Sequence, residues 1–201
     1  MSHLVKRAAP YFEGTVWSNA SKSFKNVNLH DFKGKNLLIL FYPLNWTFVC
    51  PTEINELDKN LAKFKEMNTE VLVCSVDSQH SHKAWSEAPR ENGGFAGTLE
   101  LDMLSDLSKK ISADYGVLFN DSIALRATVM IGDDQVVKHV SCNDTDVGRN
   151  MDEYVRLVDA YNYVKKHGDV CPATWKKEGD AVMSGAMNDK TKDYFKNFHK
   201  K

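Results

Sequence analysis

Cysteines are the side chains of this sequence with the greatest chemical reactivity, and one of them has an unusual position. The four are Cys50, Cys74, Cys142 and Cys171. Cys50 follows a short apolar run and comes directly before Pro51, where a helix is expected to begin. The unpaired N–H groups and the dipole of a helix start favour an anion, and the thiolate is the nucleophilic form of cysteine. Cys50 is therefore a candidate redox or catalytic residue.

Three other residues can support such chemistry: two lie near Cys50 in the sequence, and one lies in a distant apolar run. Thr47 can place a hydroxyl beside the sulfur, and Pro43 can shield the pocket without adding a donor. Arg126 interrupts the apolar run 124–129, and an arginine in a strand core needs a buried anion or a route to water. Plainer explanations stay open: Cys50 as a small buried hydrophobe, Thr47 as a turn residue, and Arg126 on an edge strand.

The other cysteines and the histidines do not suggest a disulfide scaffold or a metal site. Four cysteines in 201 residues are too few for such a scaffold, and neither a C-x-x-C pair nor zinc-type spacing occurs. Cys74 is expected in the core, and Cys142 is expected near the surface. His80 and His82 lie two positions apart on a predicted helix, so they face different sides. We expect no metal and no cofactor.

Composition and charge exclude several classes of partner. The chain has 26 basic and 27 acidic residues and a formal charge of -1, which does not favour nucleic acid or an anionic membrane surface. Apolar runs stay shorter than the ~18 residues of a membrane span. The first residues contain no apolar signal-peptide core, so a cytoplasmic location is expected.

The expected elements alternate between strands and helices. The patterns predict strands at 35–42 and 70–76, helices at 51–67 and 79–88, a hairpin of 123–131 with 135–141, and a helix at 148–166. This order predicts an α/β fold with a mixed central sheet flanked by helices, and a thioredoxin-like core fits it. We expect a thioredoxin-like domain over 1–167 and an extended C-terminal tail over 168–201 that contains Cys171, with a short polar helix near 189–199.

Several motifs resemble one known family, the typical 2-Cys peroxiredoxins. The segment FYPLNWTFVCPTE (41–53) is similar to the active-site signature of that family, and GDVCPATW (168–175) to its resolving-cysteine motif. Shorter matches are HKAW (82–85), DYGVL (114–118), RAT (126–128) and KDYF (192–195). Together the matches extend over nearly the whole chain.

The resemblance implies a thiol peroxidase without metal, heme or flavin. Cys50 would attack a hydroperoxide and become a sulfenic acid, while Thr47 and Arg126 hold the peroxide oxygens and Pro43 shields the sulfur. Glu53 would orient the arginine; its plain alternative is helix capping. Cys171 of a partner subunit would then form an intersubunit disulfide, which a thioredoxin-like dithiol or a flavoprotein would reduce.

The resemblance also implies a homodimer and, in many family members, a decamer of five dimers. Two other functions stay open: a holdase chaperone and a peroxide sensor that relays its disulfide to a partner. A general disulfide reductase is disfavoured because the C-x-x-C dithiol is absent. The sequence departs from the family at Asn45-Trp46, where Asp-Phe is usual. It also departs at 93–97, where it has Gly-Gly-Phe-Ala-Gly and family members that are sensitive to overoxidation carry Gly-Gly-Leu-Gly.

Overall fold

The computed structural model describes residues 4–180 and 182–198. By packing, the chain divides into two compact units, Met1–Met151 and Asp152–Lys201. This division places the long helix that follows Met151 with the C-terminal segment, whereas the sequence-based division placed that helix before residue 168. The division into a peroxidase domain over 1–167 and a tail over 168–201 concerns function and stays a prediction.

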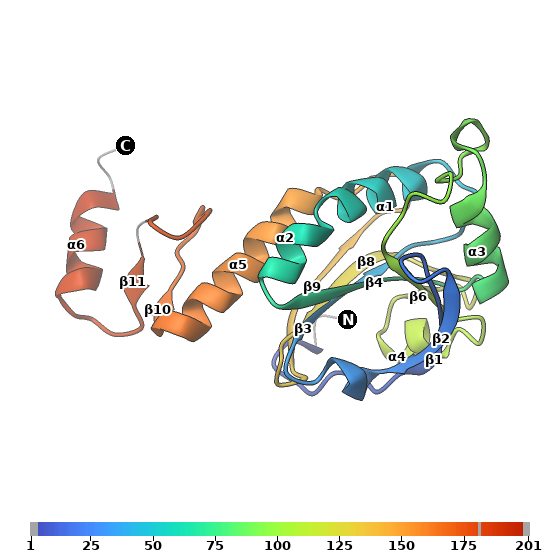
Figure 1. Cartoon of the computed structure of the whole chain (residues 1–201). Helices are drawn as coiled ribbons and strands as arrows, with labels where there is room; N and C mark the ends of the chain where they lie inside the picture. Colours follow the sequence, from blue (N-terminus) through green and yellow to red (C-terminus); the bar gives the residue numbers. More distant parts are fainter. Residues whose placement is uncertain (1–3, 181, 199–201) are drawn as a thin grey trace. The chain divides into compact units, whose positions relative to one another are not determined.

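The first unit is built on a seven-stranded sheet with the order β2-β1-β5-β4-β3-β8-β9 (Figure 1). β3 pairs in parallel with β4, and β4 with β5, whereas the other neighbours pair antiparallel. The expected mixed sheet is therefore confirmed. Its strands are β1 (Glu13–Ser18), β2 (Ser23–Asn28), β3 (Asn36–Phe41), β4 (Thr69–Ser75), β5 (Asp102–Ser105), β8 (Arg126–Ile131) and β9 (Val137–Asn143).

Three of these strands, β1, β2 and β5, were not expected from the sequence. β2 is largely polar and partly exposed, and β5 has four residues, so neither forms a clear apolar run. The strand expected at 123–131 is also shorter than predicted. Ile123–Ala124 forms β7, which pairs with β6 (Leu118–Phe119), and β8 begins after Leu125.

Short helices flank the sheet, with α1 and α2 on one face and α4 on the other (Figure 1). Their bounds are α1 (Val49–Lys59), α2 (Leu61–Glu66), α3 (Gln79–Glu87) and α4 (Lys110–Asp114), with 3-10 turns η2 (Leu29–Phe32) and η3 (Arg90–Asn92). The prediction of a single helix over 51–67 is wrong in two respects. The helix is interrupted at Asn60, whose side-chain amide donates to the Glu56 carbonyl at 2.9 Å. The helix also begins at Val49 instead of Pro51, which places Cys50 within its first turn.

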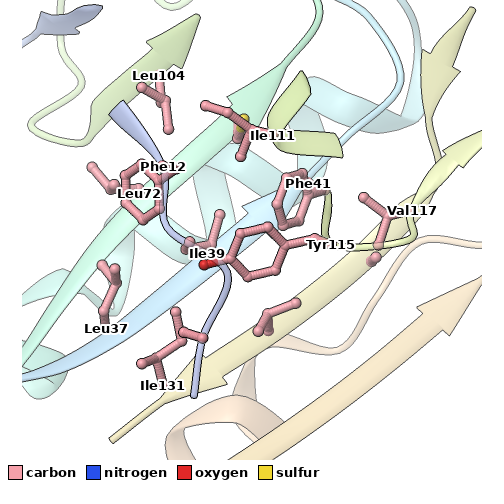
Figure 2. Packing of buried hydrophobic residues seen from close by; sticks show 14 of the residues in the cluster. Phe12, Leu37, Ile39, Phe41, Leu72, Leu104, Ile111, Tyr115, Val117 and Ile131 are labelled. Carbon is pink, nitrogen blue, oxygen red and sulfur yellow. The ribbon is translucent and has the colours of Figure 1, made fainter. Parts of the chain in front are cut away.

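β3 occupies the centre of the unit because all six of its residues are buried. Alternate side chains of this strand enter a core with β4, β5 and α4 (Figure 2). Members of this core labelled there are Phe12, Leu37, Ile39, Phe41, Leu72, Leu104, Ile111, Tyr115, Val117 and Ile131. A continuous apolar strand buried on both faces is typical of an interior strand. Its carboxyl end leads directly into the loop before Cys50.

The second unit consists of a long helix and a short hairpin with a final helix. Its elements are α5 (Met151–His167), β10 (Asp169–Val170), β11 (Met183–Ser184) and α6 (Asp189–Phe198). Trp175 is buried there against Tyr163, with ring centroids 5.6 Å apart, and its carbonyl accepts from Arg156 at 2.9 Å. The expected polar helix near 189–199 is confirmed as α6, and His199 lies outside the described residues. Across the described ranges, no helix has the length and apolar character needed to cross a bilayer.

Candidate active site around Cys50

The site lies where the loop after β3 enters the first turn of α1. Cys50 is fully buried, as are Phe41, which ends β3, and Tyr42, which follows it. All four cysteines are free thiols. Burial alone fits a structural role for Cys50 as a small hydrophobe. Its polar neighbours therefore decide between that role and a reactive one.

Arg126 is the cation beside Cys50. Its Nη1 donates to the Cys50 sulfur at 3.3 Å and to Glu53 Oε2 at 2.9 Å, and its Nε donates to the Thr145 carbonyl at 2.6 Å. The side chain is 4 % exposed, and β8 lies between β3 and β9. The edge-strand explanation for Arg126 is therefore wrong, because the guanidinium stays buried on an interior strand.

A second buried arginine, Arg149, completes the cluster, and the sequence analysis missed it. Its Nε and Nη2 donate to the two carboxylate oxygens of Glu53, and its backbone N–H donates to Oε1. Nη1 also donates to the Ala127 carbonyl and to Thr128 Oγ1. Arg149 follows Gly148 and precedes Asn150 and Asp152, so the local sequence gives no sign of a contact with a residue near Cys50.

Glu53 receives four hydrogen bonds from the two arginines. Burial raises the pKa of its carboxyl, but the hydrogen bonds and charge of Arg149 and the charge of Arg126 outweigh burial, so the pKa lies below its usual value. The carboxylate is thus charged at neutral pH. The capping alternative for Glu53 is wrong in this structure, because its oxygens bind arginines instead of the start of α1.

The charges of this buried cluster do not cancel without Cys50. Two guanidinium groups and one carboxylate leave one positive charge, and the side chains of Arg126, Glu53 and Arg149 are 4 %, 1 % and 1 % exposed. An uncompensated buried charge is strongly unfavourable. A thiolate at Cys50 would supply the missing negative charge and accept the Arg126 hydrogen bond.

Gly148 allows the loop before α5 to reach the start of α1. A Cβ at this position would lie 3.3 Å from Val49 Cγ1, which is tighter than most side-chain contacts, and 4.0 Å from Glu53 Cγ, which is an ordinary contact. The backbone of Arg149 can therefore donate to the Glu53 carboxylate at 2.8 Å. The glycine is the local reason that α1 and this loop share one charge cluster.

The two remaining sequence candidates belong to the loop that precedes Cys50. Pro43 is buried and adds no N–H donor to the pocket. Thr47 is partly exposed, and its hydroxyl donates to the Leu44 carbonyl at 3.0 Å. With its proton used in this way, Thr47 Oγ1 presents lone pairs that can accept a hydrogen bond from a ligand.

The other cysteines differ from Cys50 in their surroundings. Burial raises the pKa of Cys74 well above its usual value, as expected for a core residue, and raises that of the exposed Cys142 less. Burial also raises the pKa of Cys171 in the second unit, and the charge of Asp159 adds to this effect. The Cys171 thiol donates to the Ala160 carbonyl at 3.8 Å.

Metal binding finds no support among residues 4–180 and 182–198. Within these ranges, no group of three or more histidine, cysteine and carboxylate side chains is arranged to hold a metal ion. His82 is buried, and its ring nitrogens hydrogen-bond with Tyr42, Asn45 and the Leu104 carbonyl.

Comparison with known proteins gives matches along nearly the whole chain. Residues 5–140 match the AhpC/TSA family, and residues 160–197 match the C-terminal domain of 1-Cys peroxiredoxin. The mitochondrial thioredoxin-dependent peroxide reductase of Mus musculus is 46% identical over 196 residues, 97% of this chain and 74% of the mouse protein.

Solved structures agree with the sequence matches. The reduced 2-Cys peroxiredoxin of Plasmodium vivax overlaps with a TM-score of 0.88 at 45% identity, covering 91% of this chain and 94% of that one. The mitochondrial 2-Cys peroxiredoxin of Plasmodium falciparum overlaps with a TM-score of 0.80 at 42% identity, covering 84% and 100%. These overlaps confirm the α/β thioredoxin-like fold that the sequence predicted.

Proposed function

The chain belongs to the AhpC/TSA family as a typical 2-Cys peroxiredoxin, and from this premise we propose how its residues reduce peroxides. The enzyme is a thioredoxin-dependent peroxide reductase. One observation carries the assignment of the reacting residue: Arg126 Nη1 lies 3.3 Å from the sulfur of Cys50 in a buried cluster that lacks one negative charge.

In the first step, the Cys50 thiolate attacks the distal oxygen of a hydroperoxide. An S–O bond forms, the O–O bond breaks, and the departing oxygen takes a proton to leave as water or an alcohol. Arg126 stabilises the charge that develops on the peroxide oxygens, since its guanidinium is already desolvated and fixed by Glu53. Thr47 Oγ1, which donates to Leu44, accepts the peroxide O–H and orients the substrate.

Supporting residues have positioning roles in this proposal. Glu53 holds Arg126 against the sulfur and is itself held by a bidentate ion pair with Arg149. Pro43 keeps the pocket dry and adds no competing donor. Preorganised charges of this kind act strongly in a site that excludes water.

In the second step, Cys171 of the partner subunit attacks the sulfenic sulfur of Cys50. An S–S bond forms, the hydroxyl leaves as water, and a thioredoxin-like dithiol then reduces the disulfide. This step makes a homodimer the smallest active unit, and a decamer of five dimers is the expected larger assembly. A dedicated flavoprotein is the alternative reductant.

The compartment is a further prediction. The sequence favours the cytoplasm, whereas the printed names of several relatives place those proteins in mitochondria. Fractionation of cells that express the natural protein, followed by detection in the cytosolic and mitochondrial fractions, decides between the two.

Turnover with a thioredoxin system tests the proposed function. Consumption of NADPH by thioredoxin reductase, thioredoxin and this enzyme should depend on added hydrogen peroxide. The Cys50→Ser variant should lose turnover, whereas Cys74→Ser, which changes a buried cysteine with no described role, should keep it. Equal turnover by wild type and Cys50→Ser would reject Cys50 as the peroxide-reacting residue.

A further inference from the structure

Cys50 must move before it can form a disulfide. Its residue is 0 % exposed, and an S–S bond of ~2.05 Å requires direct contact between two sulfurs. The loop from Pro43 to Phe48 connects the rigid strand β3 to the helix turn that carries Cys50. Whatever holds this loop in place therefore controls how readily Cys50 becomes accessible to a second thiol.

Asn45 is the residue that fixes this loop to its surroundings. Its backbone N–H donates to Asp77 Oδ2 at 2.9 Å, and its side-chain oxygen accepts from the Tyr42 hydroxyl at 2.7 Å. Its side-chain nitrogen lies 2.8 Å from Ser81 Oγ and 3.1 Å from His82 Nδ1. Asn45 is 5 % exposed, so these bonds are largely shielded from water.

The proton positions of this group match an amide at position 45. His82 Nε2 lies 3.2 Å from the Leu104 carbonyl, which can only accept, so Nε2 carries a proton. In a neutral ring, Nδ1 is then an acceptor, which matches the side-chain N–H of Asn45. The Tyr42 hydroxyl in turn needs an acceptor, which the amide oxygen supplies. A carboxylate at position 45 would accept from Tyr42 but would offer no proton to a neutral His82.

The chain changes character directly after Asn45. Trp46 has a φ of 60°, a left-handed conformation that is unfavourable for a bulky residue, and is 50 % exposed. Phe48 is 92 % exposed, and the ring centroid of Trp46 lies 6.4 Å from that of Trp85. Strained conformations persist where neighbouring bonds hold them. Asn45 is therefore the last buried residue of the loop before Cys50.

We propose that Asn45, together with its partner His82, is the positioning anchor that sets how readily the Cys50 loop opens. A closed loop keeps the sulfur beside Arg126, where it reacts with peroxide. An open loop allows the sulfenic acid to condense with Cys171. This inference rests on the proposed function and adds that Asn45 governs the competition between the two states.

The competition has a measurable product ratio. The Cys50 sulfenic acid either condenses with a thiol, forming an S–S bond and releasing water, or reacts with a second hydrogen peroxide, forming a sulfinic acid and water. Loss of the anchor favours the open loop. The Asn45→Ala variant should then need a higher peroxide concentration for half conversion to the sulfinic acid. The expected rise is at least about fivefold, the factor that follows from one lost hydrogen bond.

The experiment measures intact mass and disulfide content across a series of hydrogen peroxide concentrations, with the thioredoxin system present. Asn60→Ala is the matched control, because Asn60 is also a buried asparagine, with a side-chain bond to the Glu56 carbonyl at the far end of α1. If Asn45→Ala is poorly folded, Ser81→Ala removes one acceptor of the same amide at a partly exposed position. Unchanged ratios in both Asn45→Ala and Ser81→Ala, or equal changes in Asn60→Ala, would overturn the proposal.

The pH dependence of an Asn45→Asp variant provides a second test, because a purely structural role of Asn45 would not make the product ratio depend on pH. In Asn45→Asp, His82 must take up a proton to donate to the new carboxylate, so the anchor should hold at low pH and weaken as pH rises. The other titratable groups against His82 are Asp77 and Tyr42, which are unchanged in this variant. The product ratio of Asn45→Asp, divided by that of wild type, should change with pH; a constant quotient contradicts the anchor. Failure of wild-type Cys50 to react with peroxide would instead reject the proposed function.

Discussion

Arg126 Nη1 contacts both the sulfur of Cys50 and the carboxylate of Glu53, at 3.3 and 2.9 Å. One donor group thus links the nucleophile to the anion that positions the cation. Because Arg149 also binds Glu53, the carboxylate is shared by two arginines and cannot neutralise both. The sulfur of Cys50 therefore faces a guanidinium whose charge is only partly balanced.

Removal of the Arg126 guanidinium should slow the first step. In Arg126→Gln, the thiolate loses its charged donor and the peroxide oxygens lose theirs, so the second-order rate constant with hydrogen peroxide should fall by about 10²–10³. Rapid mixing with peroxide, followed by quenching and intact mass, measures this constant. Arg90→Gln changes an exposed arginine that donates to Thr98 and should react like wild type. A loss of less than about tenfold in Arg126→Gln would show that this residue is not central to the chemistry.

Glu53 should matter for stability as well as for rate. Glu53→Gln leaves two buried guanidinium groups without a counter-charge, so the free energy of unfolding should fall by about 3–5 kcal/mol. Glu56→Gln, three residues along the same helix, removes an exposed ion pair with Lys59 and should cost less than about 1 kcal/mol. Urea denaturation of both variants at neutral pH measures the difference. Equal stabilities would mean that the buried arginines find other compensation.

His82 should make the fold sensitive to acid. Burial, its largest influence, lowers the pKa of His82 from 6.5 to about 4, so the folded state binds this proton less readily than the unfolded state. The stability that follows from the neutral ring is therefore complete above pH 6.5 and is lost as pH falls from 6.5 towards 4. The loss amounts to about 3 kcal/mol.

A comparison of variants isolates this effect from other groups that titrate in acid. The unfolding free energy of His82→Gln should depend less steeply on pH between 6.5 and 4.5 than that of wild type. His80→Gln changes the neighbouring exposed histidine and should keep the wild-type slope. If His82→Gln and wild type have the same slope, the buried ring is not the source of the acid sensitivity.

Gly94 should tolerate no side chain, although its φ is not in the left-handed region. A Cβ at this position would lie 2.3 Å from the Ala88 carbonyl oxygen, so the backbone must shift. Gly94→Ala should therefore lower the free energy of unfolding by about 1–3 kcal/mol. Gly185→Ala meets nothing within 4 Å and serves as the control in thermal denaturation. Wild-type stability in Gly94→Ala would show that the segment 93–97 adjusts without cost.

Local pattern was sufficient for the central elements and for part of the site. β3 and β4 are continuous apolar runs, and α3, α5 and α6 follow helical periodicity, so their positions were predicted within a few residues. β1, β2 and β5 are stabilised by pairing with distant strands, which local pattern does not reveal. The break at Asn60 depends on one side-chain bond to the backbone and gave no signal either.

The site shows the same division between local and distant information. Cys50, Thr47, Pro43 and Glu53 lie within eleven residues of one another, so motif and helix-start arguments found them together. Arg126 was found because a charge interrupts an apolar strand. Arg149 was missed because its role depends on a contact 96 residues away in sequence, made possible by Gly148.

The central claim is that Cys50 reacts with peroxide and Cys171 of the partner subunit resolves the product. A non-reducing gel after one equivalent of hydrogen peroxide tests it most directly, with wild type, Cys50→Ser and Cys171→Ser in parallel. Wild type should shift to a disulfide-linked dimer that dithiothreitol reverses, and neither variant should form that dimer. A wild-type chain that stays monomeric while Cys50 is oxidised, or a dimer that persists in Cys171→Ser, would contradict the account.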